Sequence, residues 1–548
     1  MGLNLKIVGA DIMKQIDTEC IDRFCIPERV LVETAGRACF RALIGNNDFR
    51  NLSHFVFVGS GNNGADGYVI ARLLLSGGFK VKVVSLPERV PNKNSGSEVL
   101  ESVKQSYLAL GGDVIISPQE DSEISFLVDG FPDASIFIDA LTGTGFSGVL
   151  REGPLSCLIK NLNQARLSRG CLVFSVDLPS GNYPEEGVFR NGLVADETWA
   201  LQCLKQIHVD PDAADKVGRV RCLDIGMPDS VFNVVKESSE LLTSNYIGDL
   251  LSSRFPDSEN SYKSQKGHVL VVGGSQGYEG APALSSLGAF RSGAGLVSVV
   301  TPDGCVRSLP PEAMHKSVPA SDNGTFGVFD SNVWDLILSR KNSVVLGPGF
   351  GLDGSGLEDF IGLLLHAINN QSLPAVLDAD VLNLLASNNS LKALVSDKMV
   401  LTPHPGEFSR IMGCSISDVK AFRMKLSREF VENIPCTLVL KGPRTLVTTS
   451  GGDQYFCPHR EPALGVAGSG DVLSGVIGAF MARGFSPAES ALLGVFVHGE
   501  TGSRFSAKVG FSCGALISEI IDELPSSISY LLSCPFDSVG NLPARPEI

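Results

Sequence analysis

The stretch GVAGSGDVLSGVIGAFMARG, residues 465–484, joins a glycine-rich turn to an apolar helix, with Asp471 in the first helical turn. Such a turn exposes backbone N–H groups, and the helix dipole adds positive potential, so the place favours an anion. A carboxylate here either offsets the dipole, a stabilisation of under about 1 kcal/mol, or has a chemical role. In that role, Asp471 would accept the proton of an attacking hydroxyl while the helix start steadies phosphate oxygens.

The residues before this stretch alternate between short apolar runs and helical patterns. Apolar runs occur within residues 267–302, 343–351, 374–385, 399–413 and 436–452. Strands separated by helix-length segments predict a mostly parallel α/β sheet, here with one late hairpin.

Polar residues follow several of these runs. TPHPGEF presents His404 and Glu407, LKGPRT presents Lys441, and LDADVLN presents Asp378 and Asp380. The histidine is either part of a ligand site or a buried hydrogen-bonding group, and the lysine either reaches a nucleotide phosphate or stays solvated. One aspartate could hold Mg²⁺ through water, or both could cap turns.

The first half of the chain shows a second α/β pattern. Predicted strands lie at HFVFVG (54–59), KVKVVSL (80–86), ASIFIDA (134–140) and CLVFSVDLPSG (171–181). A chain of 548 residues is too long for one core, and a polar, serine-rich stretch separates the two patterns. We therefore predict two domains, 1–238 and 239–548.

GSGNNGADG, residues 59–67, contains the GxGxxG spacing of phosphate-cradling turns and precedes a helix expected to start near Tyr68. By itself this spacing is also compatible with a tight turn that binds nothing. Asp139 and Asp177 end two further strands, and ligands of open α/β sheets bind beyond the carboxyl ends of strands. A lone strand-end aspartate is often a cap, but two of them beside an Asn-rich turn favour a site.

The composition limits the classes of molecule that the protein is expected to bind. The net charge of −15 argues against a general nucleic-acid or anionic-membrane binder. Thirteen cysteines stand singly, without metal-binding spacing, which indicates reduced thiols. No apolar run is long enough for a membrane span and no targeting signal is evident. We expect a cytoplasmic protein, a homo-oligomer, that binds small molecules.

Three motifs of the first half, GSGNNGADGYVIAR, IDALTGTGFSG and SVDLPSGNYPEEG, resemble those of NAD(P)H-hydrate epimerases, over about residues 10–230. The resemblance implies a Rossmann-like doubly wound sheet, catalysis by Asp177, and a potassium ion on Asn63, Asp139 and Ser180. It also implies that a hydrated nicotinamide dinucleotide contacts Asn62, Asn63, Gly64, Ala65, Asp66, Gly143, Thr144, Gly145, Phe146, Ser147, Gly148 and Val149.

The second half resembles the NAD(P)H-hydrate dehydratases, a branch of the ribokinase-like fold. The matching pieces over about residues 267–480 include GGSQGYEGAPALSSLGAFRSGAGLV, PPEAM, GPGFG, LTPHPGEFSRIMG and GSGDVLSG. The resemblance implies that Asp471 acts on the substrate hydroxyl. Its implied substrate contacts are Ala281, Gly349, Gly351, His404, Pro405, Gly406 and Glu407, and its implied ADP or ATP contacts are Lys441, Gly442, Pro443, Arg444, Thr445, Gly468, Ser469 and Gly470.

Together these features predict a bifunctional enzyme that repairs hydrated NADH and NADPH. One domain would interconvert the R and S epimers, and the other would phosphorylate the S form with ADP or ATP so that phosphate leaves. A vitamin-alcohol kinase of the ribokinase-like fold is one alternative. A regulatory module with inactive sites is another, favoured mildly by Ala65, where the epimerases usually have glycine, and by the charged HREPALG segment (459–465).

Overall fold

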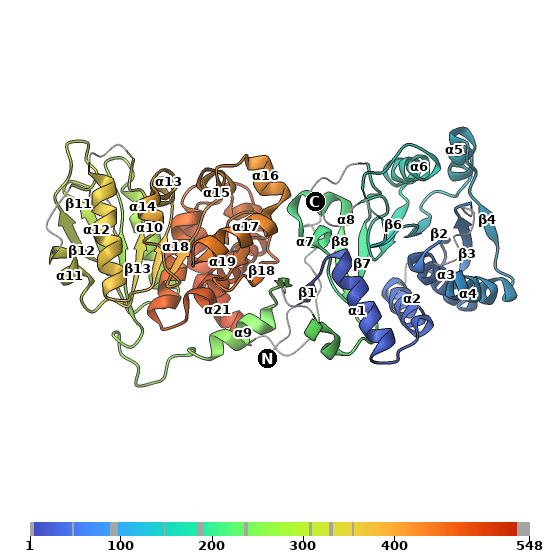
Figure 1. Ribbon diagram of the computed structural model, residues 1–548, viewed down its shortest axis with the longest axis horizontal. Helices are drawn as coiled ribbons and strands as arrows, with labels where there is room; N and C mark the ends of the chain where they lie inside the picture. The colour runs from blue at the N-terminus through green and yellow to red at the C-terminus, as the bar shows by residue number, and fades with distance from the viewer. Residues whose placement is uncertain are drawn as a thin grey trace. The chain divides into compact units, whose positions relative to one another are not determined.

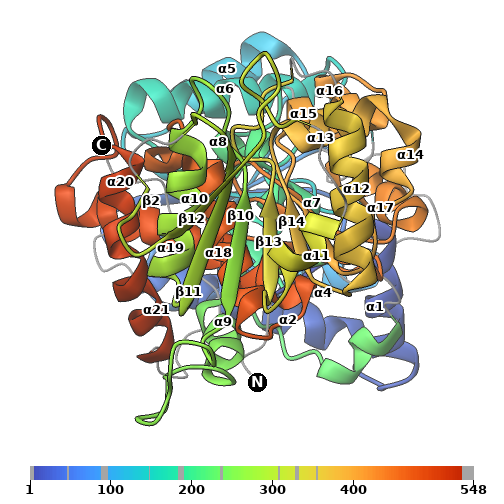
Figure 2. The ribbon, with the colours of Figure 1, turned by 90° about the vertical axis from the view of Figure 1, so that its left-hand side faces the viewer.

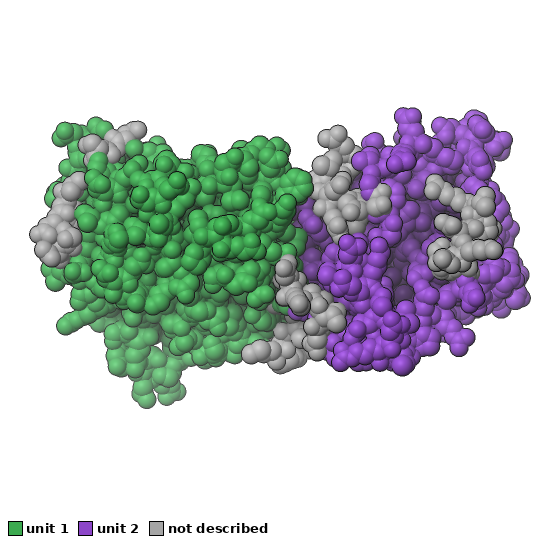
Figure 3. Space-filling model, viewed as in Figure 1, with its two compact units in different colours: residues 1–4, 239–537 green, residues 5–238, 538–548 purple. Residues whose placement is uncertain are grey.

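A computed structural model describes residues 5–45, 49–87, 97–146, 148–182, 191–234, 239–305, 309–327, 332–352 and 356–533. The chain forms two compact units (Figure 3), which we call the N-terminal unit (residues 5–238) and the C-terminal unit (residues 239–537). Among the described helices, none has the length and apolar character needed to cross a membrane.

The N-terminal unit is built on a parallel sheet. Its strands run in the order β4 (Val114–Ile116), β3 (Lys80–Ser85), β2 (Ser53–Val58), β5 (Ile136–Ala140), β6 (Leu172–Val176), β7 (Glu197–Leu201) and β8 (Arg219–Leu223). β2 pairs in parallel with β3 on one side and with β5 on the other, so the strand order reverses there. This is the switch point of a doubly wound sheet, and it confirms the Rossmann-like fold class. The four predicted strands are present, whereas β4, β7 and β8 were not predicted.

Helices cover both faces of this sheet (Figure 1). Along β2, Val56 and Val58 belong to one core and Phe55 and Phe57 to another, as the period of two requires. The helices are α1 (Ala10–Asp22), α2 (Glu28–Ile44), α3 (Asn62–Ser76), α4 (Ser97–Ala109), α5 (Asp121–Asp129), α6 (Pro154–Arg169), α7 (Gln206–Val209) and α8 (Ala214–Val217), and β1 (Leu5–Ile7) bridges to Leu204.

The prediction that the helix after the glycine turn starts near Tyr68 was wrong, because α3 begins at Asn62. Its glycines lower the intrinsic helix propensity, but they let the first turns pack directly on the sheet. A Cβ at Gly64 would lie 2.1 Å from the carbonyl oxygen of Gly59, and one at Gly67 would lie 2.8 Å from the Cβ of Ala140. The asparagine-rich segment is therefore the start of a helix rather than a free loop.

The C-terminal unit contains the second sheet. Its strands run in the order β9 (Ser239–Leu241), β18 (Gln454–Phe456), β17 (Leu446–Thr448), β16 (Thr437–Leu440), β15 (Met399–Leu401), β14 (Ala375–Leu377), β13 (Ser343–Leu346), β10 (His268–Val272), β11 (Leu296–Pro302) and β12 (Met314–Val318). Strands β10 to β16 pair in parallel, and β16, β17 and β18 pair antiparallel. The mostly parallel sheet with a late hairpin is thus confirmed.

Helices lie on both sides of these strands; Figure 2 shows α10 (Gly280–Arg291) and α19 (Pro487–Val509) on one side and α11 (Asn332–Leu338) and α12 (Leu357–Asn370) on the other. The remaining helices of the unit are α9 (Ser244–Ser252), α13 (Asp380–Ser387), α14 (Asn389–Lys392), α15 (Pro405–Met412), α16 (Ile416–Ala421), α17 (Arg423–Asn433), α18 (Ser469–Ala482), α20 (Ile517–Ile520) and α21 (Leu524–Ser533).

Helix α18 is the central element of this unit. Residues from Val472 to Ala482 are buried all round the helix, which fits an apolar helix enclosed between α10, α19 and the sheet. Gly468, at φ +85°, is the residue before its first turn, and Asp471 is in that turn as predicted.

Candidate active sites

A cavity of about 720 Å³ opens in the N-terminal unit at the carboxyl ends of the strands. Its wall includes Gly59 after β2, Ser85 at the end of β3, Leu141 after β5, Asp177 after β6 and Leu201 at the end of β7. The cavity therefore spans the switch point between β2 and β5, where open α/β sheets bind their ligands.

Asp177 forms a buried ion pair in this cavity. Its Oδ1 lies 2.5 Å from Nζ of Lys205, and the two side chains are 10% and 1% exposed. The Lys205 ammonium also donates to the carbonyl oxygens of Leu201 and Cys203, each at 3.1 Å. Although burial alone would lower the pKa of Lys205, the Asp177 carboxylate raises it above its usual value. Lys205 is thus a fixed, charged partner.

The backbone of Asp177 is also unusual. Its φ of +64° lies in the left-handed region, which costs a residue with a Cβ about 1 kcal/mol or more. The peptide oxygen lies 2.8 Å from Nε2 of His208, and the peptide N–H donates to Trp199. Strain held in place by such contacts is a frequent feature of functional residues.

Two other carboxyl groups of the same cavity wall have a raised pKa, those of Asp66 and Asp17. Asp66, on α3, is buried, and its Oδ1 has no hydrogen-bond partner within the described part of the chain. Burial, and then the charges of Asp177 and Asp17, raise the pKa of Asp66 well above its usual value. Half-buried Asp17, on α1, has its pKa raised to about 6, mainly by burial, with Lys205 opposing. The surroundings of Asp66 therefore favour its neutral form.

The residues expected to hold potassium form one connected group. Asp139 accepts four hydrogen bonds, from the Oγ and N of Ser180, the Oγ of Ser175 and the N of Leu141. Burial raises the pKa of Asp139, and these hydrogen bonds oppose the rise. Asn63 donates to the carbonyl of Thr142 at 3.1 Å, while its own Oδ1 is buried with no partner among the described residues. That orphaned oxygen beside hard oxygen donors fits a monovalent cation.

Not all predicted residues of the first site reach the cavity. Asn62, Asn63, Asp66, Gly143, Thr144, Gly145, Phe146 and Asp177 line it. Ala65 instead packs against Val32 and Val69, so its methyl group points into the core rather than at a ligand. Gly64 and Gly148 are not part of the cavity wall, Val149 is 73% exposed and likewise outside it, and Ser147 lies outside the described residues.

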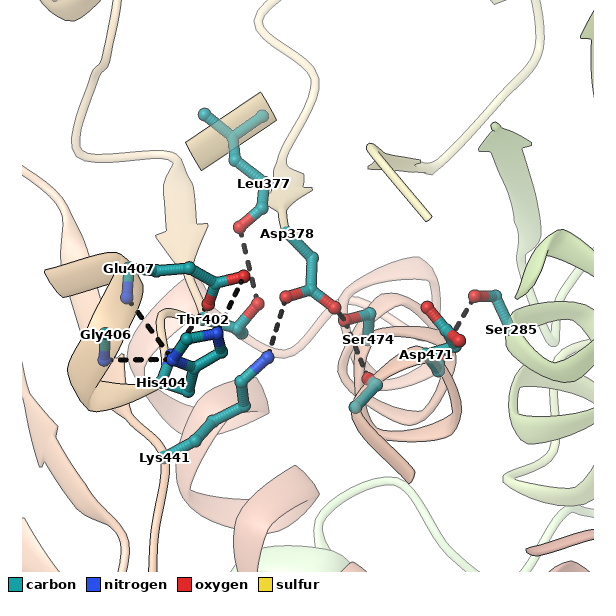
Figure 4. A network of polar contacts seen from close by, with 11 residues as sticks. Ser285, Leu377, Asp378, Thr402, His404, Gly406, Glu407, Lys441, Asp471 and Ser474 are labelled. Atoms are coloured by element: carbon teal, nitrogen blue, oxygen red, sulfur yellow. Dashed lines mark hydrogen bonds and ion pairs between the residues drawn. The ribbon is translucent and has the colours of Figure 1, made fainter. Parts of the chain in front are cut away.

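The second site is a network at the carboxyl edge of the other sheet (Figure 4). Asp378, after β14, accepts from Nζ of Lys441, after β16, at 2.9 Å and from Oγ of Ser474 at 2.5 Å. Asp378 is buried, yet its pKa lies below its usual value, since Lys441 and these hydrogen bonds outweigh the effect of burial. Lys441 is thus a paired rather than a solvated lysine.

Asp471 lies beside this network. Burial, and then the charge of Asp378, raise its pKa to about 7, with Lys441 opposing the rise. Its backbone oxygen accepts from Oγ of Ser285 on α10, and Figure 4 shows its side chain on the helix that carries Ser474. A carboxyl with a pKa near the working pH is suited to accept and return a proton.

His404 caps helix α15. Its Nδ1 accepts from the backbone N–H groups of Gly406 and Glu407, and Glu407 bonds back to the N–H of His404 at 2.8 Å. Burial, together with Lys441 and Arg410, lowers the pKa of His404, so the imidazole is neutral. With Nδ1 accepting, its remaining proton is on Nε2. Pro405 is the first residue of α15.

The GPGFG turn and the nucleotide residues lie close to these groups. A Cβ at Gly349 would lie 3.0 Å from that of Ala281, and the N–H of Gly351 donates to Asp380. A Cβ at Gly470 would lie 3.2 Å from Nζ of Lys441. The structure thus brings together the helix start formed by Gly468, Ser469 and Gly470 and the loop formed by Lys441, Gly442, Pro443, Arg444 and Thr445.

Two charged residues near this loop, Arg444 and Glu461, are directed toward other parts of the fold. Arg444 is buried, and its backbone N–H donates to the carbonyl of His459. Glu461 accepts from the N–H of Ala463 and from Oγ of Ser506, so this carboxylate faces α19. The HREPALG segment is therefore tied into the fold by its own hydrogen bonds.

The sequence did not reveal two residues of these sites, Lys205, the partner of Asp177, and Ser474, the partner of Asp378. Lys205 lies in a segment without a glycine turn, and Ser474 is one serine within an apolar helix. Only the position of Lys205, a lone lysine after an apolar strand, could have indicated a buried counter-ion.

Comparisons with known proteins agree on both halves. The family described as NAD(P)H-hydrate dehydratase matches residues 269–526, and the family described as YjeF-related protein N-terminus matches residues 28–207. The bifunctional NAD(P)H-hydrate repair enzyme Nnr of Coxiella burnetii is 33% identical over 91% of this chain and 94% of its own. The enzyme of the same description from Moorella thermoacetica is 30% identical over 95% and 96%.

Among solved structures, a ribokinase-like superfamily protein from Enterococcus faecalis covers 54% of this chain and 96% of its own, with 24% identity and a TM-score of 0.45. An ADP/ATP-dependent NAD(P)H-hydrate dehydratase from Bacillus subtilis, co-crystallised with ATP and Mg²⁺, covers 53% and 98%, with 23% identity and a TM-score of 0.41.

Proposed function

The chain belongs to the family of bifunctional NAD(P)H-hydrate repair enzymes, and on that premise we propose how its two units divide the work. It is an enzyme that epimerises hydrated NADH and NADPH and dehydrates the S form to the intact cofactor with ADP or ATP. The N-terminal unit would be the epimerase, and the C-terminal unit would be the dehydratase. The observation that carries the proposal is Asp471, a carboxyl with a pKa of about 7 at an anion-binding helix start.

In the C-terminal unit, Asp471 accepts the proton of the ring hydroxyl as that oxygen attacks the terminal phosphorus of the nucleotide. The N–H groups at the start of α18 and the Lys441 ammonium would stabilise the developing phosphate charge, which is supported by the closeness of Gly470 to Nζ of Lys441. Phosphate then leaves the ring carbon, and loss of a ring proton restores the double bond. Phosphorylation serves this reaction because phosphate is a far better leaving group than hydroxide.

In the N-terminal unit, Asp177 would act on the hydrated ring within the cavity. Its carboxylate is held 2.5 Å from the Lys205 ammonium, and a carboxylate can bind or remove a hydroxyl proton. Asn62, Asn63 and the segment from Gly143 to Phe146 would hold the dinucleotide, supported by their places in the cavity wall.

Both ions of the expected chemistry are part of this proposal. Potassium would bind beside Asn63, Ser180 and Asp139, the last supplying negative charge, since its oxygens already accept four hydrogen bonds. The ion would offset repulsion between Asp139 and the dinucleotide phosphates. Mg²⁺ has less support from the protein, because Asp378 is bonded to Lys441 and Ser474 and Asp380 to Gly351. It would enter with the nucleotide phosphates, through water.

The alternative, a vitamin-alcohol kinase, would use the same base and helix start, but it leaves the N-terminal cavity without a purpose. A cytoplasmic location is supported by the cysteines, since the twelve in the described residues are free thiols. A homo-oligomer remains a prediction, which sedimentation of the purified chain would test.

The decisive experiment supplies the purified chain with a mixture of both epimers and with ATP or ADP. Recovery of reduced-nicotinamide absorbance from both epimers, with consumption of nucleotide, is the expected result. A stable phosphorylated product would indicate the kinase instead.

The Asp177→Asn variant tests the epimerase residue in the same assay. The S form should be repaired quickly, while the R form should be consumed only at its spontaneous rate of epimerisation. If both epimers are consumed in one fast phase, Asp177 is not the epimerase residue.

A further inference from the structure

Five carboxyl groups line the N-terminal cavity, those of Asp17, Glu28, Asp66, Glu101 and Asp177, and among the described residues only Asp177 is paired with a buried cation. Asp177 lies 2.5 Å from the Lys205 ammonium. Asp66 is 5% exposed, and its Oδ1 finds no hydrogen-bond partner in the described residues. The same cavity therefore holds one carboxyl paired with a buried ammonium and one buried carboxyl oxygen without a hydrogen-bond partner among the described residues.

This contrast is the usual arrangement of an acid–base pair. A nearby cation favours the charged form of a carboxyl, whereas burial and neighbouring negative charge favour the neutral form. For Asp66, burial is the largest cause of its raised pKa, and the charges of Asp177 and Asp17 add to it. Two titratable groups whose environments hold them in opposite protonation states at one pH can act as base and acid.

We propose that Asp66 is a second catalytic residue of the epimerase site, the proton donor to the substrate's ring nitrogen, opposite the Asp177 carboxylate that Lys205 positions. The inference rests on the epimerase function proposed above for this cavity and adds to it the acid and the positioning residue.

The step balances without any co-reactant. Water adds to an enamine at the carbon next to nitrogen, so the epimeric carbon bears both the hydroxyl and the ring nitrogen. Asp177 takes the hydroxyl proton, the O–H electron pair forms a C=O bond, and the C–N bond breaks. Its electron pair goes to nitrogen, which takes the proton of Asp66. After rotation of the aldehyde, nitrogen adds to its other face, Asp66 recovers its proton, and the oxygen is reprotonated by Asp177.

Of the other carboxyls in the cavity wall, Asp17 and Asp66 have a raised pKa, and Asp66 is the better acid of these two. Asp17 is half-buried on α1 and has a pKa of about 6, so it is mostly ionised at neutral pH. Asp66 follows Asn62 and Asn63 in the first turns of α3, and all three residues line the cavity. A group that donates a proton to nitrogen has to hold one first, and burial raises the pKa of Asp66 well above its usual value.

Lys205 acts through Asp177 rather than on the substrate. Three acceptors fix its ammonium: Oδ1 of Asp177 and the carbonyl oxygens of Leu201 and Cys203. The N–H of Leu201 also donates to Oδ1 of Asp177. The carboxylate is thus held from the β7 side, which leaves its other oxygen for the substrate.

The test uses the full-length chain, a mixture of both epimers and excess nucleotide. Wild type must first consume both epimers quickly, and a failure there would contradict the proposed function itself. Asp66→Asn keeps the shape but cannot exchange a proton, so the epimerase kcat should fall about 10²–10⁴-fold with KM nearly unchanged. Asp17→Asn is the matched control and should lose less than about 10-fold.

The results of these variants distinguish a catalytic role of Asp66 from a structural one. An Asp66→Asn variant that epimerises at the wild-type rate overturns the proposal, as does a large loss in Asp17→Asn alone. A wild-type-like epimerase KM in the same variant shows that the N-terminal unit is folded. Asp66→Glu, which restores an acid, should recover part of the rate; no recovery, combined with loss of ligand binding, would assign Asp66 a structural role instead.

Lys205→Met tests the positioning role through the split between kcat and KM. Without the ammonium, the Asp177 carboxylate loses the partner that fixes it, so the epimerase kcat should fall by up to about 10²-fold while KM stays nearly unchanged. Lys205→Arg, which restores a cation, should recover part of the rate. A wild-type kcat in Lys205→Met overturns the positioning role.

Discussion

At the scale of single residues, Asp471 combines its proposed catalytic role with a cost to the fold. Replacing it with asparagine keeps the shape of the side chain but removes the base. We expect Asp471→Asn to lower dehydration about 10²–10⁴-fold while epimerisation is unchanged, because the epimerase residues lie in the other unit. Wild-type-like dehydration by this variant would contradict the assignment.

The pH dependence follows from the raised pKa of Asp471, about 7. Only the ionised carboxylate accepts a proton, so kcat/KM of dehydration should rise with pH up to about 7 and then level off. The residual rate of Asp471→Asn should lack this limb. A wild-type profile that falls between pH 5 and 7 would show that another group is the base.

The same residue makes a prediction about stability. A carboxyl whose pKa is raised in the folded state, here from 3.8 to about 7, penalises folding once it ionises. The penalty is absent below the unfolded pKa, grows as pH rises toward 7 and is constant above it. Asp471→Asn should therefore be more stable than wild type at pH 8, by on the order of 2–4 kcal/mol. Thermal denaturation at pH 5 and pH 8 would check this, and an equal gain at both values would contradict it.

Asp139 is the residue that tests the cation site. Asp139→Asn removes its charge but keeps an oxygen for Ser180 and Leu141. We expect weaker potassium dependence and a higher KM for epimerisation, with kcat less affected than in Asp177→Asn. Titration with KCl against LiCl at constant ionic strength measures the effect. Unchanged potassium dependence would exclude Asp139 from the site.

At the scale of elements, the start of α3 depends on two glycines in close contact. A Cβ at Gly64 would lie 2.1 Å from the carbonyl oxygen of Gly59. Gly64→Ala should therefore displace Asn62 and Asn63, destabilise the unit by about 1–3 kcal/mol and raise the epimerase KM. Denaturant unfolding and epimerase kinetics provide the measurements.

Ala65 provides the matched control, because it packs against Val32 and Val69 away from the cavity. Ala65→Gly should cost about 1 kcal/mol of helix stability and leave the epimerase KM unchanged. If Ala65→Gly changes KM more than Gly64→Ala, the methyl group of Ala65 does reach the ligand.

Elements also show what the sequence could predict. Apolar runs ending in glycine or aspartate, such as those before Gly59, Asp139 and Asp177, were placed correctly, because local composition determines a buried parallel strand. The start of α3 was predicted wrongly, because glycine has a low helix propensity and only packing on the sheet explains why the helix begins at Asn62. Lys205 and Ser474 were missed because their partners, Asp177 and Asp378, are distant in sequence and meet only at the sheet edge.

At the scale of the whole molecule, the two proposed sites use the same physical arrangement. In each, a strand-end aspartate is paired with a buried lysine, Asp177 with Lys205 and Asp378 with Lys441. In each, a second, uncompensated carboxyl with a raised pKa lies near the pair, Asp66 in one and Asp471 in the other. In the proposed mechanisms the pairs would provide fixed charge, and the carboxyls with raised pKa would provide exchangeable protons.

Because every residue of each proposed site comes from one compact unit, the two activities should survive separation. We expect chains 1–238 and 239–548 to fold alone, each with a cooperative thermal transition and its own activity. With excess nucleotide, the second half alone should repair a mixed-epimer sample in two phases: a fast one for the S form and a slow one set by spontaneous epimerisation. Adding the first half in catalytic amounts should merge the phases into one, because its product is the substrate of the second. If the slow phase persists while the first half is folded and binds hydrate, then epimerisation needs the covalent link between the units, and the units are not independent enzymes.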